Sequence, residues 1–68
     1  MVDSKKLKAR IVLAGYTQGK LAKAAGMSVN SLNAKINGRA PMNCDEADTL
    51  SEILNINTPA EKCEIFLA

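Results

Sequence analysis

Apolar residues recur every three or four positions in short stretches of this chain, which is the spacing of one face of an α-helix. In the first stretch these positions are Leu7, Ile11 and Ala14. Ser4 can cap the start of a helix that runs to Ala14, and residues 1–3 before it are expected to form a frayed end. Val12 and Leu13 lie off the apolar stripe. They predict a wide buried face, although Leu13 is the better candidate for exposure.

Two further helices are predicted close together, with a tight turn between them. The side chain of Thr17 can accept a hydrogen bond at the start of a helix that runs to Ala25. Gly26 ends this helix, because glycine adopts a left-handed backbone at no steric cost. Ser28 then caps a second helix that runs to about Asn37, where another glycine follows.

The predicted helix of residues 28–37 has one apolar face and one polar face. Leu32 and Ile36 lie four positions apart and mark the buried side. The opposite side carries short, uncharged residues, which are Val29, Asn30, Ser31, Asn33, Ala34 and Asn37. Amides and small apolar groups suit contacts with the base edges and the thymine methyl groups of DNA.

Another helix is predicted after the loop of residues 39–42. Asn43 can cap it, and Glu46 three positions later completes a capping box. The buried stripe of this helix consists of Ala47, Leu50, Ile53 and Leu54. Asn55 then takes the place of the glycine that often follows a helix.

Thr58 and Pro59 form the start signal of a last helix, which ends at about Phe66. The run of residues 65–67, Ile-Phe-Leu, is too apolar for a free tail. It either closes the core or contacts a partner. We favour closure of the core, because so small a chain has few other large apolar side chains.

Length and composition limit what this fold can be. A chain of 68 residues is enough for one domain, and such a chain buries only about 60% of the surface that its unfolded form exposes. Hydrophobic residues make up 47% of the chain, but Tyr16 and Phe66 are the only aromatic ones, so we expect an aliphatic core. The five predicted helices therefore indicate an all-α fold in a single domain of residues 1–68.

The charges are separated along the chain. Residues 1–39 hold eight Lys and Arg residues against Asp3, whereas residues 40–68 hold Lys62 against six acidic residues. The net charges of the two parts are therefore +7 and −5, and the total of +2 would not by itself indicate a nucleic acid. Because the basic part contains the two adjoining helices, this separation favours contact with phosphate groups.

The sequence indicates no catalytic site, metal site or cofactor. It has no histidine, and Cys44 and Cys63 alone cannot complete the usual four-ligand zinc site. Neither cysteine has an evident base, and no glycine-rich phosphate loop is present, so we expect no enzyme activity. The apolar runs are too short for a signal peptide or a membrane span, and we expect a cytoplasmic protein with reduced thiols.

Residues 17–38 carry a further pattern, which consists of Gln18, Leu21, Ala22, Ala25, Gly26, Ser28, Leu32, Asn37 and Gly38. This pattern resembles the helix-turn-helix of the phage repressor and Cro family. A weaker resemblance covers nearly the whole chain, which looks most like the short Cro-like regulators of phages and prophages from Gram-positive bacteria. It implies a lambda-repressor-like DNA-binding domain with the helix-turn-helix at helices two and three. One departure is that Lys35 stands where the family often has its last buried apolar residue, and Ile36 follows it.

The resemblance implies that the helix of residues 28–37 is the recognition helix and lies in the major groove. Asn30 is the first candidate for a base contact, because its amide can form two hydrogen bonds with an adenine. Val29 can touch a thymine methyl group. Asn33 comes next, and Ala34 can offer only apolar contact. The implied contacts with the DNA backbone are Gln18, Lys20, Lys23, Ser28, Ser31, Lys35 and Arg39.

We therefore expect a transcription regulator whose partner is a double-stranded DNA operator and not a membrane. One recognition helix reads only a few base pairs, so we expect a homodimer on DNA, formed from a monomer or weak dimer in solution. One alternative is an antitoxin that represses its own operon. Another is an antirepressor or other protein-interaction module, which predicts an exposed apolar patch around Leu13 and residues 65–67.

Overall fold

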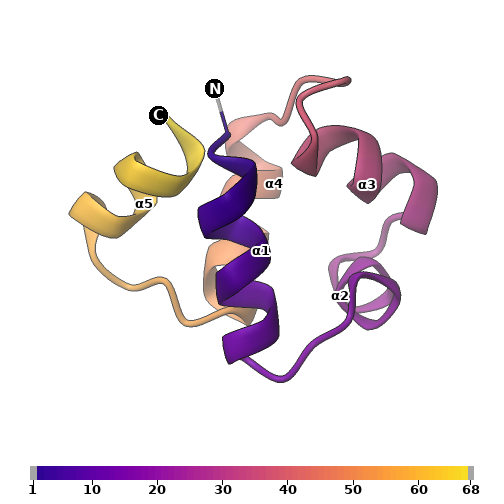
Figure 1. Cartoon of the computed structure of the whole chain (residues 1–68), viewed down its shortest axis with the longest axis horizontal. Coiled ribbons are helices and arrows are strands. Elements are labelled where there is room, and N and C mark those ends of the chain that lie inside the picture. Colours follow the sequence, from indigo (N-terminus) through magenta and orange to yellow (C-terminus); the bar gives the residue numbers. More distant parts are fainter. Residues whose placement is uncertain (1, 68) are drawn as a thin grey trace.

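The computed structural model describes residues 2–67, and the regular secondary structure in this range is helical. The helices are α1 (Ser4–Leu13), α2 (Gln18–Ala25), α3 (Val29–Ile36), α4 (Cys44–Ile53) and α5 (Pro59–Phe66). In Figure 1, α2 and α3 lie together on one side of the molecule and α5 lies on the other. α2 packs against α3 and α4, and α1 packs against α3 and α5. The predicted all-α arrangement of five short helices is confirmed.

Side-chain caps fix where four of the helices begin. The caps of α2 to α5 are Thr17, Ser28, Asn43 and Thr58, as the sequence predicts. Each accepts a hydrogen bond from a backbone N–H in the first turn of its helix. The predicted capping box is also present, because the Glu46 side chain accepts from the N–H of Asn43 at 3.0 Å.

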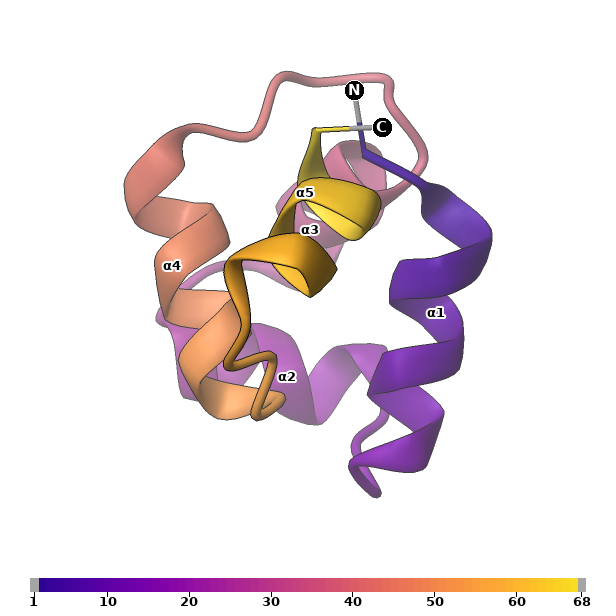
Figure 2. The ribbon, with the colours of Figure 1, turned by 90° about the vertical axis from the view of Figure 1, so that its left-hand side faces the viewer.

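Residues near the two ends of the described range are held together. The Asp3 carboxylate caps α1 by accepting from an N–H of the first turn at 3.1 Å, so the prediction of Ser4 as the cap is wrong. The N–H of Asp3 donates to the carbonyl of Ile65 at 2.6 Å, and Val2 packs against the core. Figure 2 shows α1 beside α5. Of the expected frayed end, residues 2 and 3 are therefore anchored, and the first residue lies outside the described range.

The core lies where the five helices meet. Its buried apolar residues are Leu7, Ile11, Leu21, Ala22, Leu32, Ile36, Leu50, Leu54, Ile56, Ile65 and Phe66. Ile65 and Phe66 therefore close the core, which is the interpretation favoured by the sequence, whereas Leu67 is exposed. The expected wide buried face of α1 is wrong, because Val12 is 75% exposed. Leu13, the better candidate for exposure from the sequence, is indeed 79% exposed.

Gly19, in the first turn of α2, is not required by the local packing. A Cβ atom added there would lie 3.9 Å from Thr17 Oγ1 and 4.0 Å from Val29 Cγ2, which is ordinary contact. Gly19→Ala should therefore raise the free energy of unfolding by about 0.4–1 kcal/mol, because it restricts the unfolded chain.

Gly26→Ala is the matched control for this prediction. Gly26 has φ +73°, and a side chain in this left-handed conformation costs about 1–2 kcal/mol. Urea denaturation of the two variants should thus give changes of opposite sign. A loss of stability in Gly19→Ala would contradict the prediction.

Candidate nucleic-acid interface

The turn between α2 and α3 is built from short-range hydrogen bonds. Gly26 ends α2 with a left-handed backbone, and the N–H of Met27 donates to the carbonyl of Ala22 at 2.9 Å. The Ser28 hydroxyl then accepts from the N–H of Ser31 at 3.1 Å and begins α3. Because the connection is so short, α2 determines where α3 lies.

α3 buries one face and exposes part of the other. Leu32 and Ile36 are fully buried and hold the helix against the core. Val29 is 49% exposed in the first turn, and Asn30 beside it is exposed. The half-buried residues of the uncharged face are Ser31, Asn33 and Ala34. Val29 and Asn30 are therefore the most accessible of the four predicted base contacts.

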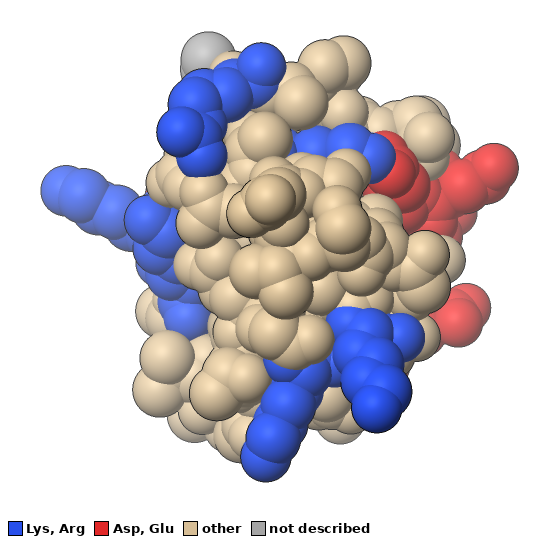
Figure 3. Space-filling model, turned by 90° about the vertical axis from the view of Figure 1, so that its right-hand side faces the viewer, with Lys and Arg blue, Asp and Glu red and all other residues tan. Residues whose placement is uncertain are grey.

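Positive side chains border this uncharged surface. Figure 3 shows the side of the molecule that carries α2 and α3, with uncharged atoms at its centre, Lys and Arg side chains around the rim and acidic side chains at one edge. Lys20 and Lys23 are exposed on α2, and Arg39 is exposed in the loop after α3. Ser28 is also exposed, and Gln18 is half-buried at the start of α2. An anionic ligand across the centre would thus meet cations at its borders.

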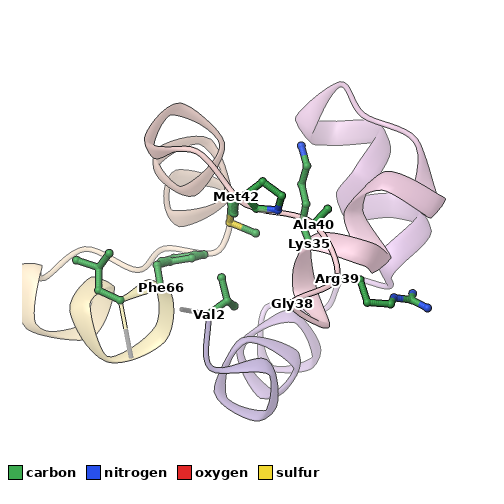
Figure 4. Close-up of a pocket in the computed structure, with 9 residues that line it drawn as sticks. Val2, Lys35, Gly38, Arg39, Ala40, Met42 and Phe66 are labelled. Atoms are coloured by element: carbon green, nitrogen blue, oxygen red, sulfur yellow. The ribbon is translucent and has the colours of Figure 1, made fainter.

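Lys35 differs from the other predicted backbone contacts. Its ammonium group pairs with the Glu46 carboxylate of α4, and the two side chains are only 17% and 19% exposed. Lys35 also lines an open hollow of about 440 Å³ beside the loop after α3, and Figure 4 shows its side chain pointing away from that of Arg39. The position is the one that the family pattern often fills with a buried apolar residue. Glu46 compensates the charge that a lysine brings there.

Asn33 lies at the centre of a polar network that the sequence analysis does not predict. Its Nδ2 donates to Gln18 Oε1 at 3.0 Å, and its Oδ1 accepts from Arg39 Nη2 at 2.5 Å. The same Oδ1 accepts from Asn37 Nδ2 at 3.2 Å, and Asn37 Oδ1 accepts from Lys8 Nζ at 3.0 Å. The network joins α1, α2, α3 and the loop after α3. Its one sequence signal is the i,i+4 spacing of Asn33 and Asn37.

The arrangement of α2 and α3 agrees with a comparison against known protein families. The family model of the Cro/C1-type HTH (helix-turn-helix) DNA-binding domain matches residues 6–65. The chain belongs to this family. No curated protein and no solved structure matched the chain. A Cro/C1-type HTH domain has double-stranded DNA as its partner, and its lambda-repressor-like fold is the one that the sequence implied.

The cysteines of this Cro/C1-type HTH domain lie outside the helix-turn-helix. Cys44 on α4 and Cys63 on α5 are free and exposed. Among residues 2–67, no group of three or more His, Cys, Asp or Glu side chains could hold a metal ion. In the same range, a helix of the length and apolar character needed to cross a membrane is absent.

Glu46 joins the end of α3 to the start of α4 in this Cro/C1-type HTH domain. Hydrogen bonds from the Lys35 ammonium group, and then from the backbone N–H of Asn43, lower the pKa of the Glu46 carboxyl below its ordinary value. Such a group stabilises the fold above its unfolded-state pKa. This contribution is lost as the pH falls through the lower folded-state pKa. Stability should therefore fall in acid more steeply in the wild-type protein than in Glu46→Gln.

Melting temperatures of both proteins from neutral to strongly acidic pH measure this difference. Glu52→Gln is a suitable control, because Glu52 lies exposed on the same helix. Its profile should stay parallel to that of the wild-type protein. A Glu46→Gln profile parallel to both would contradict a stabilising ion pair between Glu46 and Lys35.

Proposed function

We propose that this chain is a sequence-specific transcription regulator that places α3 in the major groove of double-stranded DNA. The observation that supports this most strongly is the uncharged, partly exposed face of α3 with cations at its borders (Figure 3). Uncharged polar and apolar groups distinguish base pairs, whereas cations contact every phosphate alike. Membership of the Cro/C1-type HTH family supports the same proposal.

Asn30 is the proposed principal base contact. Its exposed carboxamide offers donor and acceptor atoms, which is the combination that pairs with N7 and N6 of adenine. Val29 supplies exposed methyl groups for contact with a thymine methyl group. Ala34 adds apolar contact, and Asn33 is the remaining candidate from the sequence.

The proposed backbone contacts come from α2, from the first turn of α3 and from the loop after α3. They are Gln18, Lys20, Lys23, Ser28, Ser31 and Arg39, with Lys35 as a further candidate. Each cation that neutralises a phosphate releases counterions from the DNA, so these contacts raise affinity on every sequence. The hydroxyl and amide groups fix the position of α3 on the duplex.

We propose further that residues 1–68 act as one cytoplasmic DNA-binding domain of a Cro-like repressor from a phage or prophage. Two copies bind paired half-sites about one helical turn apart, or a multiple of that distance. The reason is that one recognition helix reads too few base pairs to find a single site in a genome. The free protein is a monomer or weak dimer under this proposal.

Selection from a pool of random duplexes with the purified protein tests the proposal. The bound fraction should converge on a sequence with two related half-sites. The selected duplex should bind about a thousandfold more tightly than random DNA, or better, at physiological salt. A pool that gains no common sequence would refute sequence-specific binding.

Arg39→Ala should reduce affinity on every sequence. It should also make the slope of log affinity against log salt shallower by about one unit, because the complex then releases one fewer counterion. Lys35→Ala should change this slope less, because Glu46 already neutralises its ammonium group. Titrations of a random duplex over a range of salt concentrations measure both slopes. A slope unchanged by Arg39→Ala would argue against a phosphate contact there.

A second candidate function is an antirepressor or other protein-interaction module. Val12 and Leu13 are strongly exposed side by side at the end of α1, which is the kind of apolar surface that this function requires. Leu67 is exposed as well, but Ile65 and Phe66 of the expected patch are buried. This candidate predicts weak DNA affinity without sequence preference. The duplex selection therefore distinguishes the two functions.

A further inference from the structure

Asn33 lies between two side chains that are proposed above as contacts with the DNA backbone. We propose that Asn33 is a positioning residue, whose carboxamide holds Gln18 and Arg39 in the orientations that phosphate groups require, and that it does not read a base. This inference rests on the proposed function. It concerns a residue that the helix-turn-helix pattern alone places among the base contacts.

The hydrogen-bond partners fix how the Asn33 carboxamide is turned. A guanidinium group has only N–H donors, so the Asn33 atom that faces Arg39 Nη2 must be the oxygen. The same oxygen also accepts from Asn37 Nδ2 at 3.2 Å. The two hydrogen bonds, from Arg39 and from Asn37, together occupy both lone pairs of the oxygen. Nδ2 of Asn33 therefore faces Gln18 and donates to its Oε1. Asn33 has one N–H group left for any other partner.

This arrangement leaves Gln18 with the end of its carboxamide that a phosphate binds. Asn33 occupies the oxygen of Gln18, so the NH₂ group of Gln18 is the part that stays available. Phosphate oxygens only accept hydrogen bonds, so they bind this NH₂ group and not the oxygen. Asn33 thus keeps Gln18 from turning its oxygen toward the DNA.

Arg39, in the loop after α3, is held in a similar way. Asn33 takes one of its guanidinium donors, while the others stay available for a phosphate group. A long side chain that is already held in place loses less conformational freedom when it binds. Asn33 therefore orients one neutral donor, from the start of α2, and one charged donor, from the loop after the recognition helix.

The same geometry argues against base reading by Asn33. An asparagine that reads adenine needs a free donor and a free acceptor on one carboxamide. Asn33 has no free acceptor and is half-buried. Asn30, in contrast, is exposed, and its carboxamide makes no hydrogen bond with another residue of the range 2–67. The two asparagines of α3 therefore have different roles.

Affinity measurements on two duplexes test this inference. One is the duplex selected above, and the other has a random sequence of equal length. Asn33→Ala should weaken binding to both by the same factor, about tenfold, because two backbone contacts lose their orientation. Asn30→Ala is the matched control, because it should weaken binding to the selected duplex alone. A loss in Asn33→Ala that is confined to the selected duplex would overturn the inference.

A double-mutant cycle with Gln18→Ala separates positioning from a general loss of folding. If Asn33 acts through Gln18, the factor lost in Asn33→Ala should be at least about threefold smaller in the Gln18→Ala background than in the wild-type protein. A destabilised fold would weaken binding equally in both backgrounds, so independent losses would overturn the inference. A wild-type protein that does not distinguish the two duplexes would instead refute the proposed function. The coupling between Asn33 and Gln18 could still be measured on random DNA.

Discussion

Phe66→Ala should lower the free energy of unfolding by about 3–5 kcal/mol, which is a large share of the total stability of so small a domain. Phe66 is 7% exposed at the end of α5 and is the aromatic ring of the buried core. Figure 4 shows this ring beside Val2 and Met42. Its removal leaves a cavity that the surrounding side chains fill only in part. The cost therefore includes both the lost burial and the cavity.

Urea denaturation at neutral pH measures this loss, with Leu67→Ala as the matched control. Leu67 is the next residue in the chain, but it is 72% exposed, so its truncation should change stability by no more than about 0.5 kcal/mol. Similar stability in Phe66→Ala and the wild-type protein would mean that the ring does not close the core.

The burial of Phe66 also affects how two copies can pair on DNA. Within residues 65–67, Leu67 alone presents a large exposed side chain. If this end of the chain contributes to pairing, Leu67→Ala should weaken the binding of a second copy to the selected duplex while leaving the fold intact. Sedimentation with and without that duplex measures the number of bound copies. A tight dimer without DNA would contradict the proposed assembly.

The starts and ends of the helices could be predicted because their causes lie within a few residues. A capping side chain accepts from a backbone N–H three positions later, so Thr17 and Ser28 identify the starts of α2 and α3. Gly26 and Asn55 both have positive φ angles after a helix, which these two residue types tolerate well. Local chemistry of this kind is visible in the sequence itself.

Contacts between distant parts of the chain could not be predicted in this way. The hydrogen bond between Asp3 and Ile65 joins the two ends of the described range. The sequence around Asp3 does not indicate this bond, and neither does the sequence around Ile65. Val12 is exposed, and whether another element covers its side of α1 depends on how the helices pack and not on the local sequence. Lys35 has a negative partner only because the first turn of α4 lies opposite the end of α3.

The hydrogen-bond partners of the candidate interface also come from distant parts of the chain. The sequence shows that Asn30 and Asn33 both lie on α3, and the family resemblance treats both as candidate base contacts. The sequence cannot show that the carboxamide of Asn33 is already hydrogen-bonded to Gln18 and Arg39, because those two residues come from other segments. Which polar groups are free for a ligand depends on tertiary structure. The residue types alone are therefore not sufficient to assign roles.

Asn30→Ala should weaken binding to the selected duplex by about 1–3 kcal/mol and leave binding to random DNA nearly unchanged. Asn30 is exposed on the first turn of α3 and carries no charge, so it contributes little to the general attraction of the phosphates. Asn30 therefore adds to the binding free energy only where a base presents the matching donor and acceptor, and we propose that this base is adenine.

Replacing each base pair of the selected half-site in turn, and measuring the wild-type protein and the variant on every duplex, locates that base. The wild-type protein should lose affinity when the contacted adenine is replaced, whereas Asn30→Ala should be insensitive at that one position and discriminate normally at the others. Lys20→Ala is the control for a backbone contact, because it should weaken binding to all duplexes equally. If Asn30→Ala also lost affinity equally on every duplex, its side chain would belong with the backbone contacts. Sequence reading would then have to come from Val29 and Ala34, which can contact methyl groups but cannot form a hydrogen bond with a base through their side chains.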